Sequence, residues 1–177
     1  MSAKPKTYVA LLRGINLGAR NRVAMKDLRA LVEELGGEDV RTYLQSGNVV
    51  FTGRALRAEA IEKGIRDSLG LDVTVLVRTK AELDQLVRGN PFATADPKTL
   101  HLTFLAAAPD KAGAKKLGDQ TFEPDELEVG GREVYLRCPN GYGRSKLSNA
   151  FLEKQLGVTA TTRNWKTVTA LAELAST

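Results

Sequence analysis

Four short segments of this chain combine glycine with amide, hydroxyl and cationic side chains, which are the groups that bind anions. They are residues 13–16 (Arg-Gly-Ile-Asn), 45–48 (Gln-Ser-Gly-Asn), 141–146 (Gly-Tyr-Gly-Arg-Ser-Lys) and 161–165 (Thr-Thr-Arg-Asn-Trp). Cationic side chains supply charge, and the backbone amides around glycine supply hydrogen-bond donors. If the segments gather in the folded chain, they predict a donor-rich site for phosphate or carboxylate groups.

The distribution of charge supports the same chemistry. Residues 1–26, 40–58, 134–152 and 154–171 hold 15 of the 26 Lys and Arg residues and none of the 21 Asp and Glu residues. The whole chain carries a formal charge of +5 and has a pI near 9.4, which favours acidic partners. A surplus of this size is also common in proteins that bind nothing anionic, so the local segregation is more informative than the total.

Each segment also has a structural interpretation. Residues 141–146 are predicted to open a helix, where backbone amides and the helix dipole favour an anion, but the same residues suit a tight strand-to-helix turn. They match neither a Walker A loop nor a dinucleotide fingerprint. Residues 161–165 are also predicted to open a helix. There Trp165 could stack on a ligand, or Asn164 or Thr162 could cap the helix while Trp165 packs in the core.

The segment at 45–48 lies between two predicted strands, and hairpin chemistry explains Ser46, Gly47 and Asn48 without any ligand. It does not require Gln45, whose amide suits a base edge or a sugar. The predicted ligand-binding residues of all four segments are Arg13, Asn16, Gln45, Ser46, Asn48, Tyr142, Arg144, Ser145, Lys146, Arg163, Asn164 and Trp165.

Three functional hypotheses follow, and none identifies a catalytic residue. The leading hypothesis is a protein that binds a nucleotide, a nucleic acid or a phosphorylated small molecule near the junction of two halves. The alternatives are a metal-independent enzyme acting on a nucleotide or phosphorylated substrate, with Ser145 or Tyr142 reacting, and a structural protein whose polar loops join two parts.

Composition excludes several other classes of site. The single histidine, His101, and the single cysteine, Cys138, cannot form a zinc site of the usual kind or an internal disulfide. His101 is expected to lie away from every candidate loop, and the acidic run at 123–128 is expected to be solvated. No cofactor, metal or membrane segment is predicted, and a cytoplasmic location is expected.

The elements that must position these residues follow one pattern twice. Strands are predicted at 8–12, 40–44, 48–52 and 73–77, with helices at 25–35 and 56–69. The second half repeats the order with strands at 100–105, 127–129, 133–136 and 158–161, helices at 112–117 and 147–156, and a terminal helix at 165–175. The predicted fold is α+β, with two ferredoxin-like βαββαβ units, antiparallel sheets and a C-terminal helix. The expected domains are residues 1–92 and 93–177, or one compact domain overall.

The quoted segments, in this order, resemble the DUF1697 family of bacterial proteins of unknown function. The resemblance rests on residues 12–16 with Asn21 and Met25, and on residues 43–49, 141–147 and 157–168. It implies an α+β fold of two ferredoxin-like units and supplies no catalytic residues. Ala19 and Ala24 depart from the expected glycine and proline, which could loosen the first loop without removing its polar groups.

Overall fold

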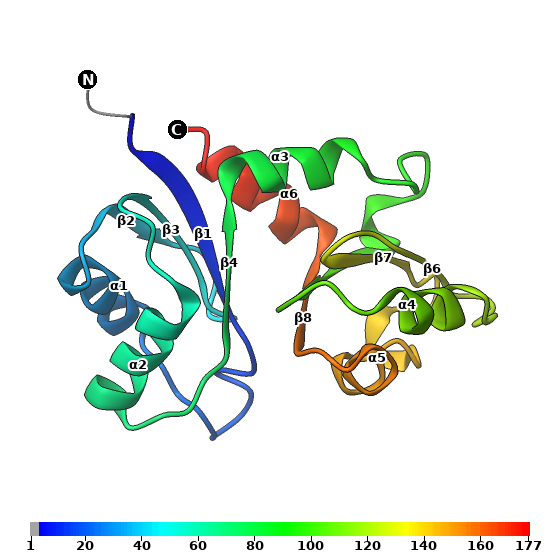
Figure 1. Ribbon diagram of the computed structural model, residues 1–177, viewed down its shortest axis with the longest axis horizontal. Helices are drawn as coiled ribbons and strands as arrows, with labels where there is room; N and C mark the ends of the chain where they lie inside the picture. The colour runs from blue at the N-terminus through cyan, green and yellow to red at the C-terminus, as the bar shows by residue number, and fades with distance from the viewer. Residues whose placement is uncertain (1–3) are drawn as a thin grey trace. The chain divides into compact units, whose positions relative to one another are not determined.

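The structure is a computed structural model that describes residues 4–177, and it divides into two units (Figure 1). The first unit holds residues 4–86 and Ala170–Thr177, and the second holds Val87–Thr169. The chain therefore passes from one unit to the other inside helix α3 (Lys80–Arg88) and again inside helix α6 (Trp165–Leu174). The expected boundary between residues 92 and 93 stays a prediction.

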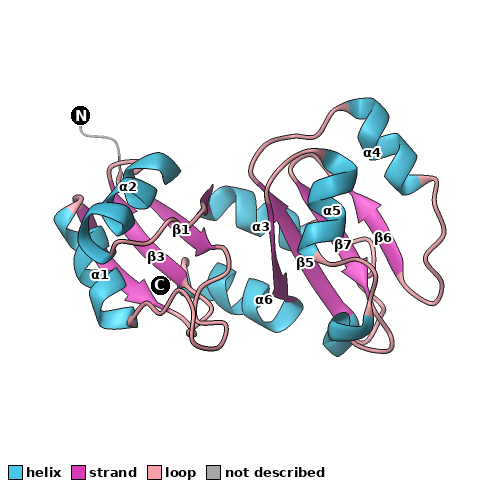
Figure 2. Ribbon diagram, turned by 90° about the horizontal axis from the view of Figure 1, so that it is seen from below, coloured by secondary structure: helices cyan, strands magenta, loops and turns pink. Residues whose placement is uncertain are grey.

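The first unit has the predicted βαββαβ order. Its elements are β1 (Lys6–Leu12), α1 (Met25–Glu34), β2 (Gly37–Thr42), β3 (Asn48–Gly53), α2 (Ala58–Leu69) and β4 (Val75–Thr79). The strands form an antiparallel sheet in the order β2-β3-β1-β4, and α1 and α2 cover one face of it (Figure 2).

The second unit repeats this arrangement. Its elements are a 3-10 turn η1 (Pro97–Thr99), β5 (Leu100–Leu105), α4 (Lys111–Gly118), β6 (Glu126–Val129), β7 (Glu133–Arg137), a 3-10 turn η2 (Tyr142–Arg144), α5 (Asn149–Leu156) and β8 (Ala160–Asn164). The antiparallel order β6-β7-β5-β8 corresponds strand for strand to the first sheet, and α4 and α5 lie on one face (Figure 2). The predicted α+β fold is confirmed.

Alternating side chains build the core of the first unit. Tyr8, Ala10 and Leu12 of β1 point to the helix-covered face, and the ring of Tyr8 stacks on Phe51 of β3 with centroids 5.5 Å apart. The intervening residues of β1 are buried as well, so the strand is a continuous apolar run. This is the buried strand that residues 8–12 predict.

The core of the second unit forms under α4 and α5. Leu105 and Leu136 pack from the sheet, and the rings of Phe122 and Phe151 meet edge to face with centroids 5.6 Å apart. Such aromatic pairs contribute about 0.5–1.5 kcal/mol beyond the area they bury. Phe122 belongs to the loop between α4 and β6, so this contact holds that loop against α5.

One local prediction was wrong and one was right only in part, because α6 does begin at Trp165 but strand β8 extends through Asn164. The glycine-rich segment at 141–146 does not open a helix directly, because α5 begins at Asn149 and Ser148 caps it by accepting a hydrogen bond from the Phe151 amide (3.2 Å). Residues 161–164 form strand β8, where pairing with β5 satisfies the hydrogen bonds of their backbone and side chains alternate between faces.

Within residues 4–177, no helix is long and apolar enough to cross a membrane.

Candidate functional site

In the first unit, two polar segments lie side by side as loops at one end of the sheet. We call residues 13–24, between β1 and α1, and residues 43–47, between β2 and β3, the loop pair. The Leu12 amide donates to the Gly47 carbonyl (2.9 Å), which joins the root of the first loop to the second. The Arg13 amide donates to the Thr74 carbonyl (2.9 Å), which joins it to the segment before β4.

Asn16 holds the loop pair together. Its Nδ2 donates to the carbonyls of Gln45 (2.7 Å) and Val23 (2.9 Å), and its Oδ1 accepts from the Val23 amide (2.8 Å). Its φ of +55° is a left-handed conformation that asparagine tolerates better than most residues. Both side-chain donors of Asn16 are therefore engaged in fixing loop geometry.

The second loop is equally fixed. Asn48 is fully buried, and its Nδ2 donates to the Tyr43 carbonyl (2.7 Å) and to Ser46 Oγ (3.1 Å). Gly47 has a φ of +91°, and a Cβ there would lie 2.6 Å from Ile15 Cδ1. The position therefore requires glycine both for its backbone and for its space.

The groups that the loop pair presents to solvent are different residues. Arg20 and Arg22 are exposed, and so is the Gln45 side chain. Leu17 and Leu44 are the two large apolar residues most exposed in the part of the chain described, at 74% and 53%. The loop pair thus offers cations, an amide and apolar side chains on a framework that Asn16 and Asn48 hold in place.

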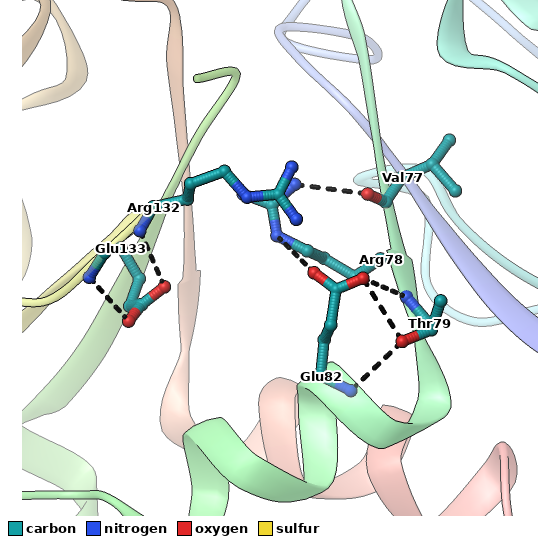
Figure 3. A network of polar contacts seen from close by, with 7 residues as sticks. Val77, Arg78, Thr79, Glu82, Arg132 and Glu133 are labelled. Atoms are coloured by element: carbon teal, nitrogen blue, oxygen red, sulfur yellow. Dashed lines mark hydrogen bonds and ion pairs between the residues drawn. The ribbon is translucent and has the colours of Figure 1, made fainter. Parts of the chain in front are cut away.

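A buried arginine on the first sheet was not singled out by sequence reasoning. Arg78 on β4 is 3% exposed, and its Nη1 donates to the Val77 carbonyl (3.1 Å) while its Nε lies 4.0 Å from Glu82 Oε2 (Figure 3). Glu82 Oε1 accepts from the Thr79 amide (3.2 Å), and Thr79 Oγ1 accepts from the Glu82 amide (3.1 Å). These bonds form a capping box at the start of α3, and the Glu82 carboxylate also faces the Arg78 guanidinium.

In the second unit, the glycine-rich segment is anchored by an aromatic stack. The ring of Tyr142 lies on His101 of β5, with centroids 4.8 Å apart and planes 23° apart. The expectation that His101 lies away from the candidate loops was therefore wrong. Burial lowers the pKa of His101, which a contact with the Thr99 backbone partly offsets, and burial raises the pKa of Tyr142.

A chain of hydroxyl groups continues from this stack. The hydroxyls of Thr103 on β5 and Thr162 on β8 are 2.7 Å apart, and Thr162 donates to Asn149 Oδ1 (2.6 Å). An interaction with Thr162 also partly offsets the effect of burial on the pKa of Tyr142. Thr162 and Tyr142 therefore serve to fasten the segment to the sheet.

Ser145 fastens the same segment to the loop before β6. Its Oγ donates to Asp125 Oδ2 (2.7 Å) and accepts from the Leu147 amide (3.0 Å). The buried Cys138 thiol also lies within hydrogen-bonding reach of Ser145, and burial raises its pKa. A raised thiol pKa lowers the fraction of nucleophilic thiolate at neutral pH.

Arg144 and Lys146 are the exposed cations of this segment, and they line two adjoining pockets. One pocket, of about 280 Å³, is lined by Pro124, Asp125, Asn140, Gly141 and Arg144. The other, of about 240 Å³, is lined by residues 121–125 with Arg144 and Lys146. Sequence reasoning missed Asp125 and Asn140, because one lies in an acidic run expected to be solvated and the other just outside the glycine-rich segment.

Strand β8 contributes no side chain to the lining of these pockets. Arg163 is 8% exposed, and its Nη1 donates to Thr161 Oγ1 (3.0 Å) and to the Thr162 carbonyl (3.2 Å). Burial lowers the pKa of Arg163 to about 10. Because side chains alternate along a strand, Arg163 and Thr162 lie on opposite faces of the second sheet, and no residue of β8 lines either pocket.

The end of β8 confirms one of two interpretations for its last residues. Asn164 Oδ1 accepts from the Thr167 amide (2.8 Å), which is the predicted N-cap of α6. Trp165 is 9% exposed, so its ring is largely packed. Across residues 4–177, no group of three or more His, Cys, Asp or Glu side chains is placed to hold a metal ion.

The candidate residues therefore form separate groups within each unit. In the first unit, Asn16 contacts the Gln45 backbone, and Ser46 contacts Asn48. In the second unit, Tyr142 and Ser145 anchor a segment whose cations line pockets, and Arg163 lies on the opposite face of the sheet. Framework roles account for the contacts of Asn16, Ser145 and Asn164 described above.

Comparison with solved structures supports the fold. The conserved bacterial protein SP0830 from Streptococcus pneumoniae is similar over 97% of this chain and 99% of its own, with a TM-score of 0.78 and 21% sequence identity. Protein BT0572 from Bacteroides thetaiotaomicron covers 90% of this chain and 93% of its own, but its TM-score of 0.23 and 6% identity carry no argument. Among curated proteins, none matches this chain.

A family profile settles the kinship that the four segments indicated. The profile described as "Protein of unknown function (DUF1697)" matches residues 6–135, which is more than half of the chain. The match includes the loop pair and most strands of both sheets. The chain belongs to the DUF1697 family.

Proposed function

We propose that this protein binds a phosphate-bearing anion, in particular a nucleic-acid strand or nucleotide, at the loop pair of the first unit. One observation carries the proposal. Arg20, Arg22 and Lys26 are exposed, and none of them has an ion pair with any residue between 4 and 177. Exposed cations elsewhere are commonly paired one helical turn away, as in Arg29 with Glu33 (2.9 Å) and Lys63 with Asp67 (2.5 Å).

Electrostatics favours an anion at these cations. Residues 1–26 and 40–58 contain no carboxylate, so no neighbour along either loop reduces the positive potential. Lys26 occupies the first turn of α1, where the helix dipole disfavours a cation and a bound anion would offset that cost. Arginine also matches phosphate geometry through two parallel hydrogen bonds.

The other exposed groups favour a nucleotide unit over a bare phosphate. Leu17 and Leu44 expose apolar surface beside the cations, and Gln45 carries an amide with both donors and acceptors. A base offers an apolar face and a hydrogen-bonding edge, so it can use both kinds of group. Spread over two loops, these groups suit a ligand that extends beyond one phosphate.

The enzyme hypothesis receives less support from the same structure. Ser145 is held between Asp125 and the Leu147 amide, and burial raises the pKa of Tyr142 so that the phenol stays neutral. Tyr142 therefore lacks an ionised phenol, and Ser145 pairs with the Asp125 carboxylate and not with histidine, the base that most often assists a nucleophile. We therefore place binding ahead of turnover.

The test is fluorescence anisotropy with short labelled single-stranded RNA and DNA across a range of salt concentrations. In the double variant Arg20→Gln/Arg22→Gln, we expect weaker binding and a salt slope that is shallower by about 1.4, because each of the two lost single-strand phosphate contacts contributes about 0.7 to it. A mononucleotide and inorganic phosphate are used as competitors. They show whether the site recognises a strand, a single nucleotide or a phosphate group.

The matched control is Arg54→Gln/Arg57→Gln, which removes the same charge from exposed, carboxylate-free positions at the opposite end of the first sheet. We expect this control to bind like the unmodified protein. Equal weakening in both variants would show that the effect comes from net charge and not from the loop pair. An absence of binding at low salt would reject the proposal.

A further inference from the structure

The second unit carries a different kind of hollow, in which opposite charges face the same space. The two adjoining pockets share Pro124, Asp125 and Arg144, and Lys146 lines one of them. They are formed by the loop before β6 and the segment after β7. Their size is just below the range of roughly 300–1,000 Å³ typical of ligand pockets, so an occupant of either must be small.

Asp125 is a fixed acceptor in this hollow. Its carboxylate is partly buried, and Oδ2 accepts from Ser145 Oγ, whose own orientation is set by the Leu147 amide. Within residues 4–177, no donor is bonded to Oδ1. A held carboxylate with an unused oxygen suits an ammonium group.

The cations of the hollow do not form an ion pair with the Asp125 carboxylate. Arg144 and Lys146 are exposed, and neither forms an ion pair with Asp125, Glu123 or another carboxylate in the described chain. Neighbouring residues show that pairing is otherwise common here, since Arg137 Nη1 lies 2.9 Å from Glu126 Oε2. Both signs of charge thus line one hollow without neutralising each other.

We infer that these pockets bind a small zwitterion that carries a primary ammonium and a carboxylate or phosphate. The ammonium is placed at Asp125, and the anionic group at Arg144 and Lys146. The amide of Asn140 lines the same pocket and can donate to or accept from the remainder of the molecule. This site lies in the other unit from the loop pair and is independent of the function proposed there.

The charges of the hollow favour a zwitterion over a ligand that carries a single charge. A free anion would gain from Arg144 and Lys146 but would meet repulsion from Asp125, and a simple amine would meet the reverse. A zwitterion with matched spacing is the class for which all three charges are favourable. Removing the Asp125 charge must therefore act in opposite directions on zwitterions and on anions.

The experiment is isothermal titration of the full chain with each standard amino acid, with phosphoethanolamine, and with inorganic phosphate and ethanolamine as single-charge probes. We expect at least one zwitterion to bind and both single-charge probes to bind more weakly. Asp125→Asn retains an oxygen for the Ser145 hydroxyl, and it should weaken zwitterion binding by about 10-fold or more while strengthening phosphate binding.

Two further variants keep the result decisive if Asp125→Asn alters folding. Arg144→Gln changes an exposed side chain, and it should weaken zwitterions and phosphate alike. Glu128→Gln, an exposed carboxylate outside both pockets, should change neither. Phosphate binding that equals the best zwitterion, or no zwitterion binding at all, would overturn the inference.

Discussion

The two units share a strand order but place their polar segments at opposite ends of it. In the first unit, these segments follow β1 and join β2 to β3, whereas in the second one segment follows β7 and the other forms β8 and the start of α6. The second-unit loops that correspond to the loop pair are residues 106–110, which are mostly alanine, and residues 130–132. The shared topology therefore fixes the core, while the loops that carry chemistry differ between units.

The polar segments of the two units are also held in place by different kinds of contact. The loop pair is locked by backbone bonds to Asn16 and by close packing at Gly47. The second-unit segment is locked by contacts between side chains, namely the stack of the titratable His101 on Tyr142 and the bond from Ser145 to Asp125. The first should be sensitive to added volume, and the second to pH.

The largest expected effect is Gly47→Ala in the first unit. A Cβ there would meet Ile15 Cδ1 at 2.6 Å and Leu12 Cβ at 2.9 Å, in addition to the cost of φ +91°. We expect a loss of roughly 3–5 kcal/mol in the free energy of unfolding, from overpacking and backbone strain together. Urea unfolding measures it.

Gly141→Ala is the counterpart in the second unit. Its φ of +95° is similar, but no atom lies within 4 Å of the added Cβ. The loss should be about 1–3 kcal/mol, from backbone strain alone. If the two variants lose the same amount, close packing is not what distinguishes the loop pair.

The next effect is Asn16→Ala, which removes three side-chain hydrogen bonds, two to Val23 within the first loop and one to Gln45 in the second. We expect a loss of about 2–4 kcal/mol, since partly buried partners are left unsatisfied and alanine tolerates φ +55° poorly. Hydrogen exchange should show faster exchange at the Val23 and Gly47 amides. Unchanged exchange there, with lower stability elsewhere, would contradict a locking role.

The sequence predicted the fold because the apolar pattern repeats unambiguously. Residues 8–12 and 100–105 are apolar runs of strand length, and the helices show clear spacing at Leu28, Leu31 and Val32. The ends of helices and strands were harder to predict at glycine, which can end a helix and can also pack where no side chain fits. The helix predicted at 25–35 ends at Glu34, and Gly37 begins β2, where it packs against Val32 and Val40 with no room for a side chain.

The candidate site was predicted less completely, since residue type does not reveal which polar groups are already hydrogen-bonded within the folded protein. Asn16 and Ser145 have the chemistry of ligand-binding residues, yet their polar atoms hold loops. Thr162 and Arg163 are adjacent in sequence but lie on opposite faces once they form a strand. Asp125 could not be found from local pattern, because its role depends on Ser145, twenty positions away.

A smaller effect should appear as a pH dependence confined to the second unit. Burial lowers the folded pKa of His101 below the ordinary value of 6.5, so the unfolded chain binds more protons as the pH falls. The contribution of His101 to stability is full above that value and is lost as the pH falls through the lower folded pKa. The first unit contains no histidine, because His101 is the chain's single one.

The measurement compares hydrogen-exchange protection between about pH 7 and pH 5 in the unmodified protein and in His101→Phe. Phenylalanine can keep the stack on Tyr142 while removing the titration. We expect second-unit amides to lose less protection on acidification in the variant, with first-unit amides unaffected. Identical pH slopes in both proteins would show that carboxylates alone govern the acid response.

The smallest expected effect returns to the loop pair and is a gain in stability. Leu44 has a φ of +61°, which a leucine adopts at a cost, and its side chain is 53% exposed, so little burial offsets that cost. Leu44→Asn should therefore raise the free energy of unfolding by about 1 kcal/mol, since asparagine tolerates this conformation better. An exposed leucine in this conformation is a candidate for a role in binding. The same variant should weaken oligonucleotide binding, whereas Leu44→Ala should weaken it without the gain in stability. A more stable Leu44→Asn protein with undiminished binding would remove Leu44 from the proposed surface and leave the cations to act alone.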